Sequence, residues 1–428
     1  MSSDTTTAPD ADATALIEAL GSRMAGDLES LTRQLREHLA ERILPLQGDE
    51  QLLQLLGASV ESNLESLVHL LRYDLPVADS HAPAAARAYA RRLAQRGIGV
   101  TALIRAYRLG QELMTGWAFE QLAAMASDPV VALRAERLFS ELTFRFIDSI
   151  SEQVVGEYET ERARRQAQRN TMRVAMVEEL VAGRTIDVAT AEQAIGHRLR
   201  QHHLAVIAWC AEADSQANPV ASLEHAIDTL VRAVGASSTP LVLPRERTMA
   251  WAWLPLGRGL EPELGQVLLE PSLSAIGGGV RLAAGRPGSG AGGFRTSHLE
   301  ASRAHRLAVA AGSHAAAVTS FLRSDVRTAT MLAQDLESTR QLVAGTLGRL
   351  SHDTDGARRL RETLQAFLHH RGSFVATGGH LHLHKNTVKY RIDKAVEELG
   401  HPIEQERLEL EIALVAADQL GPVVLQQT

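Results

Sequence analysis

The chain has 428 residues, enough for two to four domains, and its formal net charge of −7 argues against a general binder of polyanions. Hydrophobic residues make up 45% of it, an ordinary share for a globular protein, and its single cysteine, Cys210, excludes an internal disulfide. The acidic, polar stretch 1–13 is unlike a signal peptide, and no apolar run is long enough to span a membrane. We therefore expect a cytoplasmic protein with no membrane partner.

Residues 14–165 are predicted to form a helical sensory or dimerisation domain. Proline and glycine divide this segment into candidate helices at 16–44, 50–71, 83–96, 100–126 and a long stretch that starts at Pro129. In the long stretch, apolar residues recur at three- or four-residue spacing from Phe139 to Tyr158, a charged run follows, and the spacing resumes at Val174. We expect a helix that continues to about Ala182 and acts as a dimer stalk, with a solvated surface helix as the alternative.

Residues 174–312 are predicted to form a mixed α/β domain whose sheet contains antiparallel strands. A continuous apolar run, His203–Cys210, predicts a buried strand. Within it, Cys210 is expected to be a small buried hydrophobic residue. The other predicted elements are a helix at 223–234, a hairpin of 241–243 with 249–254 about the tip 244–247, a helix at 262–273, a strand at 280–284 and a helix at 298–311.

The run Gly288–Gly293 matches the pattern G-x-G-x-x-G, and it lies after a predicted strand and before a predicted helix. That context is typical of a dinucleotide fingerprint. The domain lacks the repeated strand–helix–strand pattern, however, and no clear second strand with a terminal acid follows; Asp325 is a poor candidate. We expect a flexible loop and no bound nucleotide.

Residues 325–420 are predicted to hold a helical linker and an all-α helix-turn-helix. The first helix is expected at 358–370, the second at Phe374–Leu381 with Phe374, Val375 and Leu381 inward, and the turn at 382–384 with Leu383 buried. The third helix is expected from Lys385 to Leu399, with Gly400 as its C-terminal stop. Its inward face is predicted to be Val388, Ile392, Ala395, Val396 and Leu399.

The outward face of the third helix carries the predicted DNA contacts. Asn can pair with adenine and Lys or Arg with guanine in the major groove, while hydroxyl groups suit phosphate oxygens. From Arg358 to Gly400 there are eight Lys or Arg against four acids, so positive charge is concentrated here. Three ordinary helices with a solvated polar face are the alternative. The outward candidates are Asn386, Thr387, Lys389, Tyr390, Arg391 and Lys394.

Five histidines in this region, His369, His370, His380, His382 and His384, suggest a metal site. Metal ligands must converge, and residues two apart on a helix converge poorly. We expect no metal.

The helix-turn-helix resembles that of the PucR/CdaR family of bacterial transcription regulators. The preceding Thr363, Leu364, Phe367 and Leu368 also fit the family, whereas Gly378-Gly379 departs from its usual Ala and predicts a looser second helix. The resemblance adds Thr377 and His384 to the predicted DNA-binding set, which also includes Lys385 at the start of the third helix. The matching residues are Thr377, Leu381, His384, Asn386, Thr387, Val388, Tyr390 and Arg391.

The two upstream segments resemble other modules of the same regulators. The middle segment is similar to the GGDEF-like domain of that family, through Gly285, Pro287, Gly293–His298, Glu300-Ala301 and Ala304. The predicted hairpin tip holds one acid, Glu246, and no Gly-Gly, so we expect no cyclase activity. The front segment is similar to the RsbR-type sensory module, through Arg105–Gly110.

The resemblance implies a multidomain α protein with one α/β domain. The expected order is a globin-like helical bundle, a degenerate GGDEF-like α/β domain and the C-terminal helix-turn-helix. A globin-like bundle raises the question of haem, but His38, His69 and His81 lie in no distinctive motif, so no cofactor is expected.

The leading functional hypothesis is a non-enzymatic, effector-responsive transcription regulator. Its expected partners are double-stranded DNA, a second or further copy of itself, and a small molecule or protein as effector. Two alternatives stay open: a nucleotide-binding signalling protein built on the GGDEF-like domain, and an RsbR-like adaptor for protein interaction.

Overall fold

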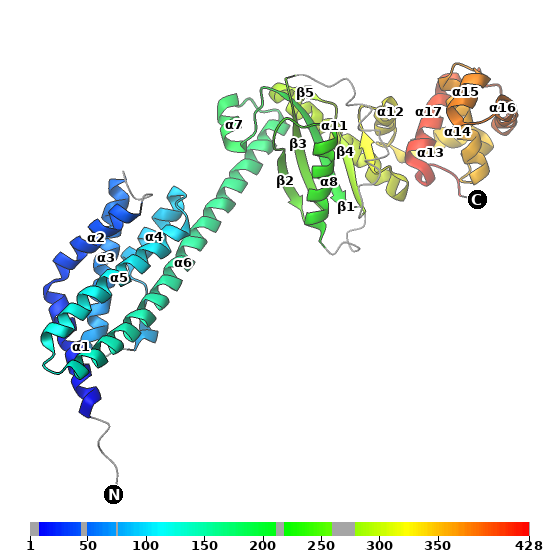
Figure 1. Ribbon diagram of the computed structural model, residues 1–428. Helices are drawn as coiled ribbons and strands as arrows, with labels where there is room; N and C mark the ends of the chain where they lie inside the picture. The colour runs from blue at the N-terminus through cyan, green and yellow to red at the C-terminus, as the bar shows by residue number, and fades with distance from the viewer. Residues whose placement is uncertain (1–7, 44–48, 74–75, 211–217, 259–278, 428) are drawn as a thin grey trace, which may run out of the picture. The chain divides into compact units, whose positions relative to one another are not determined.

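The computed structural model describes residues 8–43, 49–73, 76–210, 218–258 and 279–427, which form a mostly helical protein with one mixed sheet (Figure 1). The chain divides into two compact units, Met1–Asn170 and Thr171–Thr428. A 54-residue helix, α6 (Pro129–Ala182), contributes residues to both units, as the spacing of apolar residues predicts.

The first unit is a helical bundle with a single apolar core. Buried side chains such as Leu20, Leu56, Leu93, Leu103 and Phe146 come from five of its helices. The bundle consists of α1 (Ala8–Gly26), α2 (Leu28–Arg42), α3 (Glu50–Tyr73), a 3-10 turn at Val77–Asp79, α4 (Ala84–Arg96), α5 (Val100–Met125) and the first part of α6.

The prediction of a single helix at 16–44 is wrong, because the chain breaks between α1 and α2 (residue 44 itself lies outside the described residues). Asp27, at the break, has φ −100° and ψ 8° and makes no side-chain cap. Gly and Asp are weak helix formers, so a break at Gly26-Asp27 costs little. It allows both α1 and α2 to pack against α3.

The second unit contains a mixed sheet with the strand order β2-β3-β1-β4-β6. The strands are β1 (His202–Cys210), β2 (Leu241–Glu246), β3 (Met249–Gly257), β4 (Val280–Ala284), β5 (Gly288–Ser289) and β6 (Val318–Ser320). All pairings are antiparallel except that of β4 with β6, and β5 adds to one end of β1. The predicted strands and hairpin are confirmed, but the tip is not at 244–247 as predicted: β2 continues to Glu246, and the turn is at residues 247–248.

Strand β1 is buried on both faces, which explains its continuous apolar sequence. One face packs with α8 (Pro219–Ala233) and includes Cys210, whose thiol has its pKa raised by burial. The other face packs against α11 (Gly290–Ala311). Helix α11 corresponds to the helix predicted at 298–311, but it begins eight residues earlier, at Gly290. The helix predicted at 262–273 lies outside the described residues.

The glycine run 288–293 is not a loop, so that expectation is wrong. Gly288 is in strand β5, which pairs with β1, and α11 starts at Gly290. A Cβ on Gly293 would lie 2.1 Å from the carbonyl carbon of Gly288. The glycines allow the backbone of β5 to touch the first turn of α11, which is a packing reason for the motif.

The apolar core on the α11 side of the sheet continues into the C-terminal helices. Leu307 of α11, Val343 of α13, Leu364 of α14 and Leu414 of α17 belong to the same buried cluster. The α/β segment and the C-terminal helices thus share one core. The remaining helices of this unit are α7 (Val188–Ile195), α12 (Ser324–Leu332), α13 (Leu336–Leu347), α14 (Asp355–His369), α15 (Phe374–Leu381), α16 (Lys385–Leu399) and α17 (Arg407–Leu420).

Candidate nucleic-acid interface

Helices α14, α15 and α16 form the predicted helix-turn-helix, with α15 and α16 ending where the sequence places them. Three side chains cap the helix N-termini. Thr354 Oγ1 accepts from Ala357 N at 3.2 Å, Ser373 Oγ accepts from Ala376 N at 3.2 Å, and His384 Nδ1 accepts from Asn386 N at 3.3 Å. Gly400 ends α16 in the left-handed region, with φ 82°.

The turn between α15 and α16 is tight and well bonded. His382 takes the left-handed conformation with φ 53°, and Leu383 N donates to Gly378 O at 2.8 Å. Gly378 is buried, and a Cβ there would lie 2.6 Å from Leu383 O. Gly379 is exposed and has open space around it. Gly378 is therefore a position of close backbone contact, and only Gly379 fits the expectation of a loosened helix.

The inward face of α16 is as predicted, since Val388, Ile392, Ala395 and Leu399 are buried and Val396 is half-buried. The inward placement of Val375 is wrong, because this side chain is 71% exposed. The inward positions of α15 are Phe374, Thr377, Gly378 and Leu381, which follow the helical period and leave Val375 on the outer side. Leu383 is half-buried and packs against the core.

Most of the predicted DNA contacts lie on the exposed surface of α16. Tyr390 is 67% exposed. Arg391 is half-buried, and its Nη1 donates to Thr363 Oγ1 of α14 at 3.3 Å, so it also fixes α16 against α14. The exposed predicted residues are His384, Lys385, Asn386, Thr387, Lys389, Tyr390 and Lys394.

Thr377 cannot offer its side chain to DNA in this structure, which corrects its place in the predicted set. The residue is fully buried, and its hydroxyl donates to Ser373 O at 2.8 Å. Its role is to hold the first turn of α15. The resemblance to the family motif could not distinguish this role from a phosphate contact.

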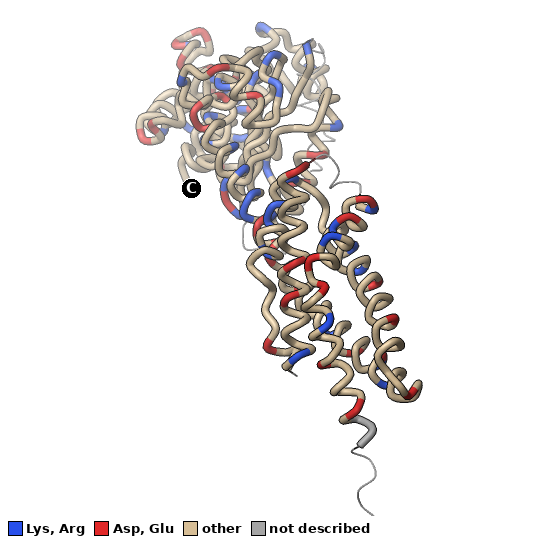
Figure 2. Tube along the Cα trace, turned by 90° about the vertical axis from the view of Figure 1, so that its left-hand side faces the viewer, with Lys and Arg blue, Asp and Glu red and all other residues tan. Residues whose placement is uncertain are grey.

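The charge on the outer face of α16 changes sign along the helix. Lys385 and Lys389 lie in the first two turns, whereas Lys394 Nζ lies 4.0 Å from carboxylate oxygens of Glu397 and Glu398. Figure 2 shows Lys and Arg interspersed with Asp and Glu along much of the chain, although residues 162–173 of α6 contain five arginines and no acid. The three lysines of α16, Lys385, Lys389 and Lys394, are the only lysines in the sequence. The N-terminal half of α16 is thus the part best suited to a phosphate backbone.

One residue that supports this surface has no recognisable signal in the sequence. Arg361 of α14 is 7% exposed, and its Nη1 donates to Leu350 O at 2.6 Å and to His352 O at 3.0 Å. It satisfies carbonyls at the end of the 3-10 turn Gly348–Ser351 and so fixes the start of α14. The rings of His370 and His380 contact each other, but the described residues contain no group of three metal-type ligands.

A buried histidine pair in the α/β domain was also not predicted. His203 Nε2 lies 2.9 Å from Leu199 O, and because a carbonyl only accepts, this nitrogen carries the proton. Its Nδ1 then accepts from His197 Nε2 at 3.1 Å. Burial, aided by the charges of His203 and Arg173, lowers the pKa of His197 to about 4, and burial also lowers the pKa of His203.

Three family models match consecutive parts of the chain. Residues 28–173 match the RsbT co-antagonist protein rsbRD N-terminal domain, residues 182–307 the GGDEF-like domain, and residues 360–416 the PucR C-terminal helix-turn-helix domain. No helix in the described part of the chain is long and apolar enough to cross a membrane.

Two individual proteins are similar to parts of this chain. An uncharacterised protein encoded in the pkwA 5′ region of Thermomonospora curvata is 43% identical over 54 residues, which is 13% of this chain and 30% of that protein. The crystal structure of a regulator of polyketide synthase expression from Bifidobacterium adolescentis is 21% identical, with a TM-score of 0.28, over 58% of this chain and 98% of that one. With an RsbRD-type N-terminal domain, a GGDEF-like domain and a PucR-type helix-turn-helix in this order, the chain has the architecture of a PucR-family regulator.

Proposed function

We propose that this protein is a cytoplasmic transcription regulator that binds specific DNA sites through the N-terminal half of α16 and responds to an effector. The observation that carries the proposal is the exposed polar face of α16, set on a capped helix-turn-helix within the segment that matches the PucR model. The β2–β3 hairpin, with Glu246 as its one acid, supports a GGDEF-like domain without cyclase activity.

The roles on α16 follow from side-chain chemistry. Asn386 and Lys389 lie on the outer face of the first two turns, where an amide can pair with adenine and an ammonium group with guanine. Lys385, Thr387 and Tyr390 supply an ammonium group and hydroxyls for phosphate oxygens. Arg391 both holds α16 to Thr363 and carries a charge toward this surface.

We further propose that the protein binds DNA as a homodimer or higher oligomer. One helix-turn-helix buries too little surface for tight, specific binding, so two copies on neighbouring half-sites are needed. On α6, Leu133 is 67% exposed and Phe144 is 64% exposed. Eleven residues apart, they lie on the same helix face, which supports self-association through α6.

Selection of genomic fragments with the purified protein, followed by gel shift at fixed salt, tests the DNA-binding proposal. We expect one preferred sequence, bound more tightly than competitor DNA. Lys389→Ala is expected to weaken it, whereas Arg407→Ala removes an equal charge from the Glu411 ion pair on α17 and serves as the control. If the wild-type protein shows no sequence preference, the regulator proposal is wrong and the adaptor hypothesis gains support.

The distribution of lysine permits a second, direct test. Because all the lysines of the sequence lie in α16, reductive methylation read by mass spectrometry reports on this helix and on the chain's amino terminus alone. We expect the selected DNA to protect Lys385 and Lys389 while the amino terminus stays reactive. Equal labelling of these lysines with and without DNA would contradict the assignment of α16 as the reader.

A further inference from the structure

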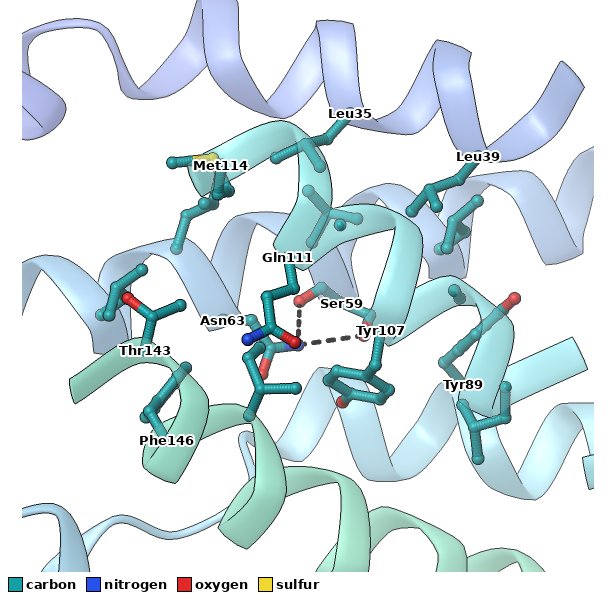
Figure 3. A pocket seen from close by; sticks show the side chains of 18 residues that line it. Leu35, Leu39, Ser59, Asn63, Tyr89, Tyr107, Gln111, Met114, Thr143 and Phe146 are labelled. Atoms are coloured by element: carbon teal, nitrogen blue, oxygen red, sulfur yellow. Dashed lines mark hydrogen bonds between the residues drawn. The ribbon is translucent and has the colours of Figure 1, made fainter. Parts of the chain in front are cut away.

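The bundle of the first unit contains a cavity of about 80 Å³ that is partly open to the surface (Figure 3). Helices α2 to α6 all contribute to its lining, through side chains such as Leu39, Asn63, Tyr89, Tyr107 and Thr143. Among the described residues that line it, none carries a charge. His38, His69 and His81 are not part of the lining, so the cavity offers no histidine to a haem iron.

Three buried oxygen atoms of this lining have no hydrogen-bond partner within the described residues: Thr143 Oγ1, Tyr89 Oη and Asn63 Oδ1. Thr143 is 1% exposed and Tyr89 is 2% exposed. The amide nitrogen of Asn63 is satisfied, since Nδ2 donates to Ser59 O at 2.7 Å (Figure 3). Native proteins leave few buried polar atoms unpaired, so three around one cavity indicate a place for a polar partner.

The unpaired atoms define what that partner must offer. Burial raises the pKa of Tyr107 to about 12, against a smaller lowering by a hydrogen bond with the Asn63 side chain, and burial together with Tyr107 raises the pKa of Tyr89. Both phenols therefore keep their protons at neutral pH and can donate. Asn63 Oδ1 can only accept. A hydroxyl group on a ligand can satisfy both kinds of atom, and the leucines around it suit an apolar body.

We propose that this cavity binds a small, uncharged, largely apolar molecule that carries a hydroxyl group, such as a simple phenol or a cyclic alcohol. The absence of charge in the lining disfavours carboxylates and phosphates, because a charged group would lose its hydration without an opposite charge in return.

A ligand in this cavity can also influence DNA binding, an inference that rests on the proposed function. Thr143, Phe146 and Ile147 line it, and all three lie on α6. The same helix carries Val177 and Leu180, which are buried in the core shared with the helix-turn-helix. An occupant that shifts or stiffens α6 therefore acts on an element common to both units.

Isothermal titration calorimetry on the 428-residue chain tests the ligand class with four probes: phenol, cyclohexanol, benzene and benzoate. We expect saturable binding of phenol or cyclohexanol, at least about fivefold weaker binding of benzene, which lacks the hydroxyl, and no binding of benzoate. If neither phenol nor cyclohexanol binds saturably, or if benzoate binds as tightly as phenol, the proposal is wrong.

Conservative variants locate the site. Thr143→Val and Tyr89→Phe each remove one hydroxyl and keep the side-chain shape. At least one of them is expected to weaken the binding of the hydroxylated probe about fivefold or more, with the affinity for benzene unchanged. Tyr158→Phe is the matched control, since that hydroxyl lies in the same bundle but already donates to Ile98 O at 2.7 Å. If Thr143→Val, Tyr89→Phe and wild-type protein bind the probe with equal affinity, the probe binds at another site.

Gel shift with and without the bound probe separates this inference from the proposed function. A change in DNA affinity supports an effector site. An unchanged DNA affinity in a protein that binds the probe removes the effector role and leaves the binding site. If the protein has no specific DNA site, the proposed function fails, while the calorimetry still decides whether the cavity binds its ligand.

Discussion

The backbone of Gly378 in α15 lies against the carbonyl oxygen of Leu383 in the turn, so close that a Cβ on Gly378 would be 2.6 Å from that oxygen. The same two residues share a hydrogen bond, Leu383 N to Gly378 O, at 2.8 Å. This contact sets the path of the chain from α15 into α16. The neighbouring Gly379 has no atom within 4 Å of an added Cβ.

These two glycines make a matched pair for mutation. Gly378→Ala is expected to destabilise the protein by about 1–3 kcal/mol, because an added methyl group in a packed site forces a backbone shift. Gly379→Ala is expected to stabilise it by up to about 1 kcal/mol through better helix propensity. Urea denaturation followed by circular dichroism measures both. A Gly378→Ala protein as stable as wild type would show that the turn adapts freely.

A second matched pair lies in the G-x-G-x-x-G run. Gly293→Ala places a Cβ 2.1 Å from the carbonyl carbon of Gly288, so we expect a loss of at least about 2 kcal/mol, or failure to fold. Gly292→Ala meets no atom within 4 Å and is expected to be neutral or stabilising. Thermal unfolding compares the two.

The same run distinguishes packing from nucleotide binding. If its glycines serve packing alone, neither a dinucleotide nor GTP raises the unfolding temperature of wild type or of Gly292→Ala protein. A concentration-dependent increase with either nucleotide would restore the nucleotide-binding hypothesis.

The boundaries of α15 and α16 were predictable because strong local signals mark them. Ser373 caps one helix, Gly400 stops the other, and the period of Val388, Ile392 and Ala395 fixes the inward face. Local rules failed where the backbone makes a distant contact. The sequence around Gly293 predicts a loop, yet this position requires glycine because the backbone of Gly288 lies against it.

The orientation of short elements and the buried polar groups were harder to predict. Eight residues of α15 give too few turns for a clear period, so the pattern cannot show that Val375 lies outside or that Thr377 is buried. The unpaired oxygens around the bundle cavity come from separate helices, and only the packing of α3, α4 and α6 brings them together.

The buried histidines predict that stability depends on pH. His197 and His298 both have their pKa lowered to about 4, chiefly by burial. In the unfolded chain they titrate near 6.5, so between about pH 6.5 and 4 the unfolded state binds protons that the folded state does not. Stability is therefore complete above about pH 6.5 and falls as the pH drops toward 4, by on the order of 3 kcal/mol for each histidine.

Urea unfolding at several pH values between 4 and 8 measures this loss. His298→Phe removes one titrating ring while keeping an aromatic group beside Trp253. The free energy of unfolding of this variant is expected to fall less steeply as the pH is lowered. His225→Gln changes an exposed histidine on α8 and is expected to leave the slope as in wild type. The same slope in His298→Phe and wild-type protein would contradict the assignment.

The exposed apolar face of α6 predicts the route of self-association. Phe144→Asp puts a charge on a side chain that is 64% exposed, so the folded monomer should tolerate it, while an interface between two copies should not. Light scattering after size-exclusion chromatography is expected to show a smaller assembly than wild type, and gel shift a lower affinity for the selected site. Tyr73→Asp, on a ring 56% exposed at the end of α3, is the control. If Phe144→Asp leaves the mass unchanged, α6 does not form the interface through this face, and any oligomer must assemble through another surface.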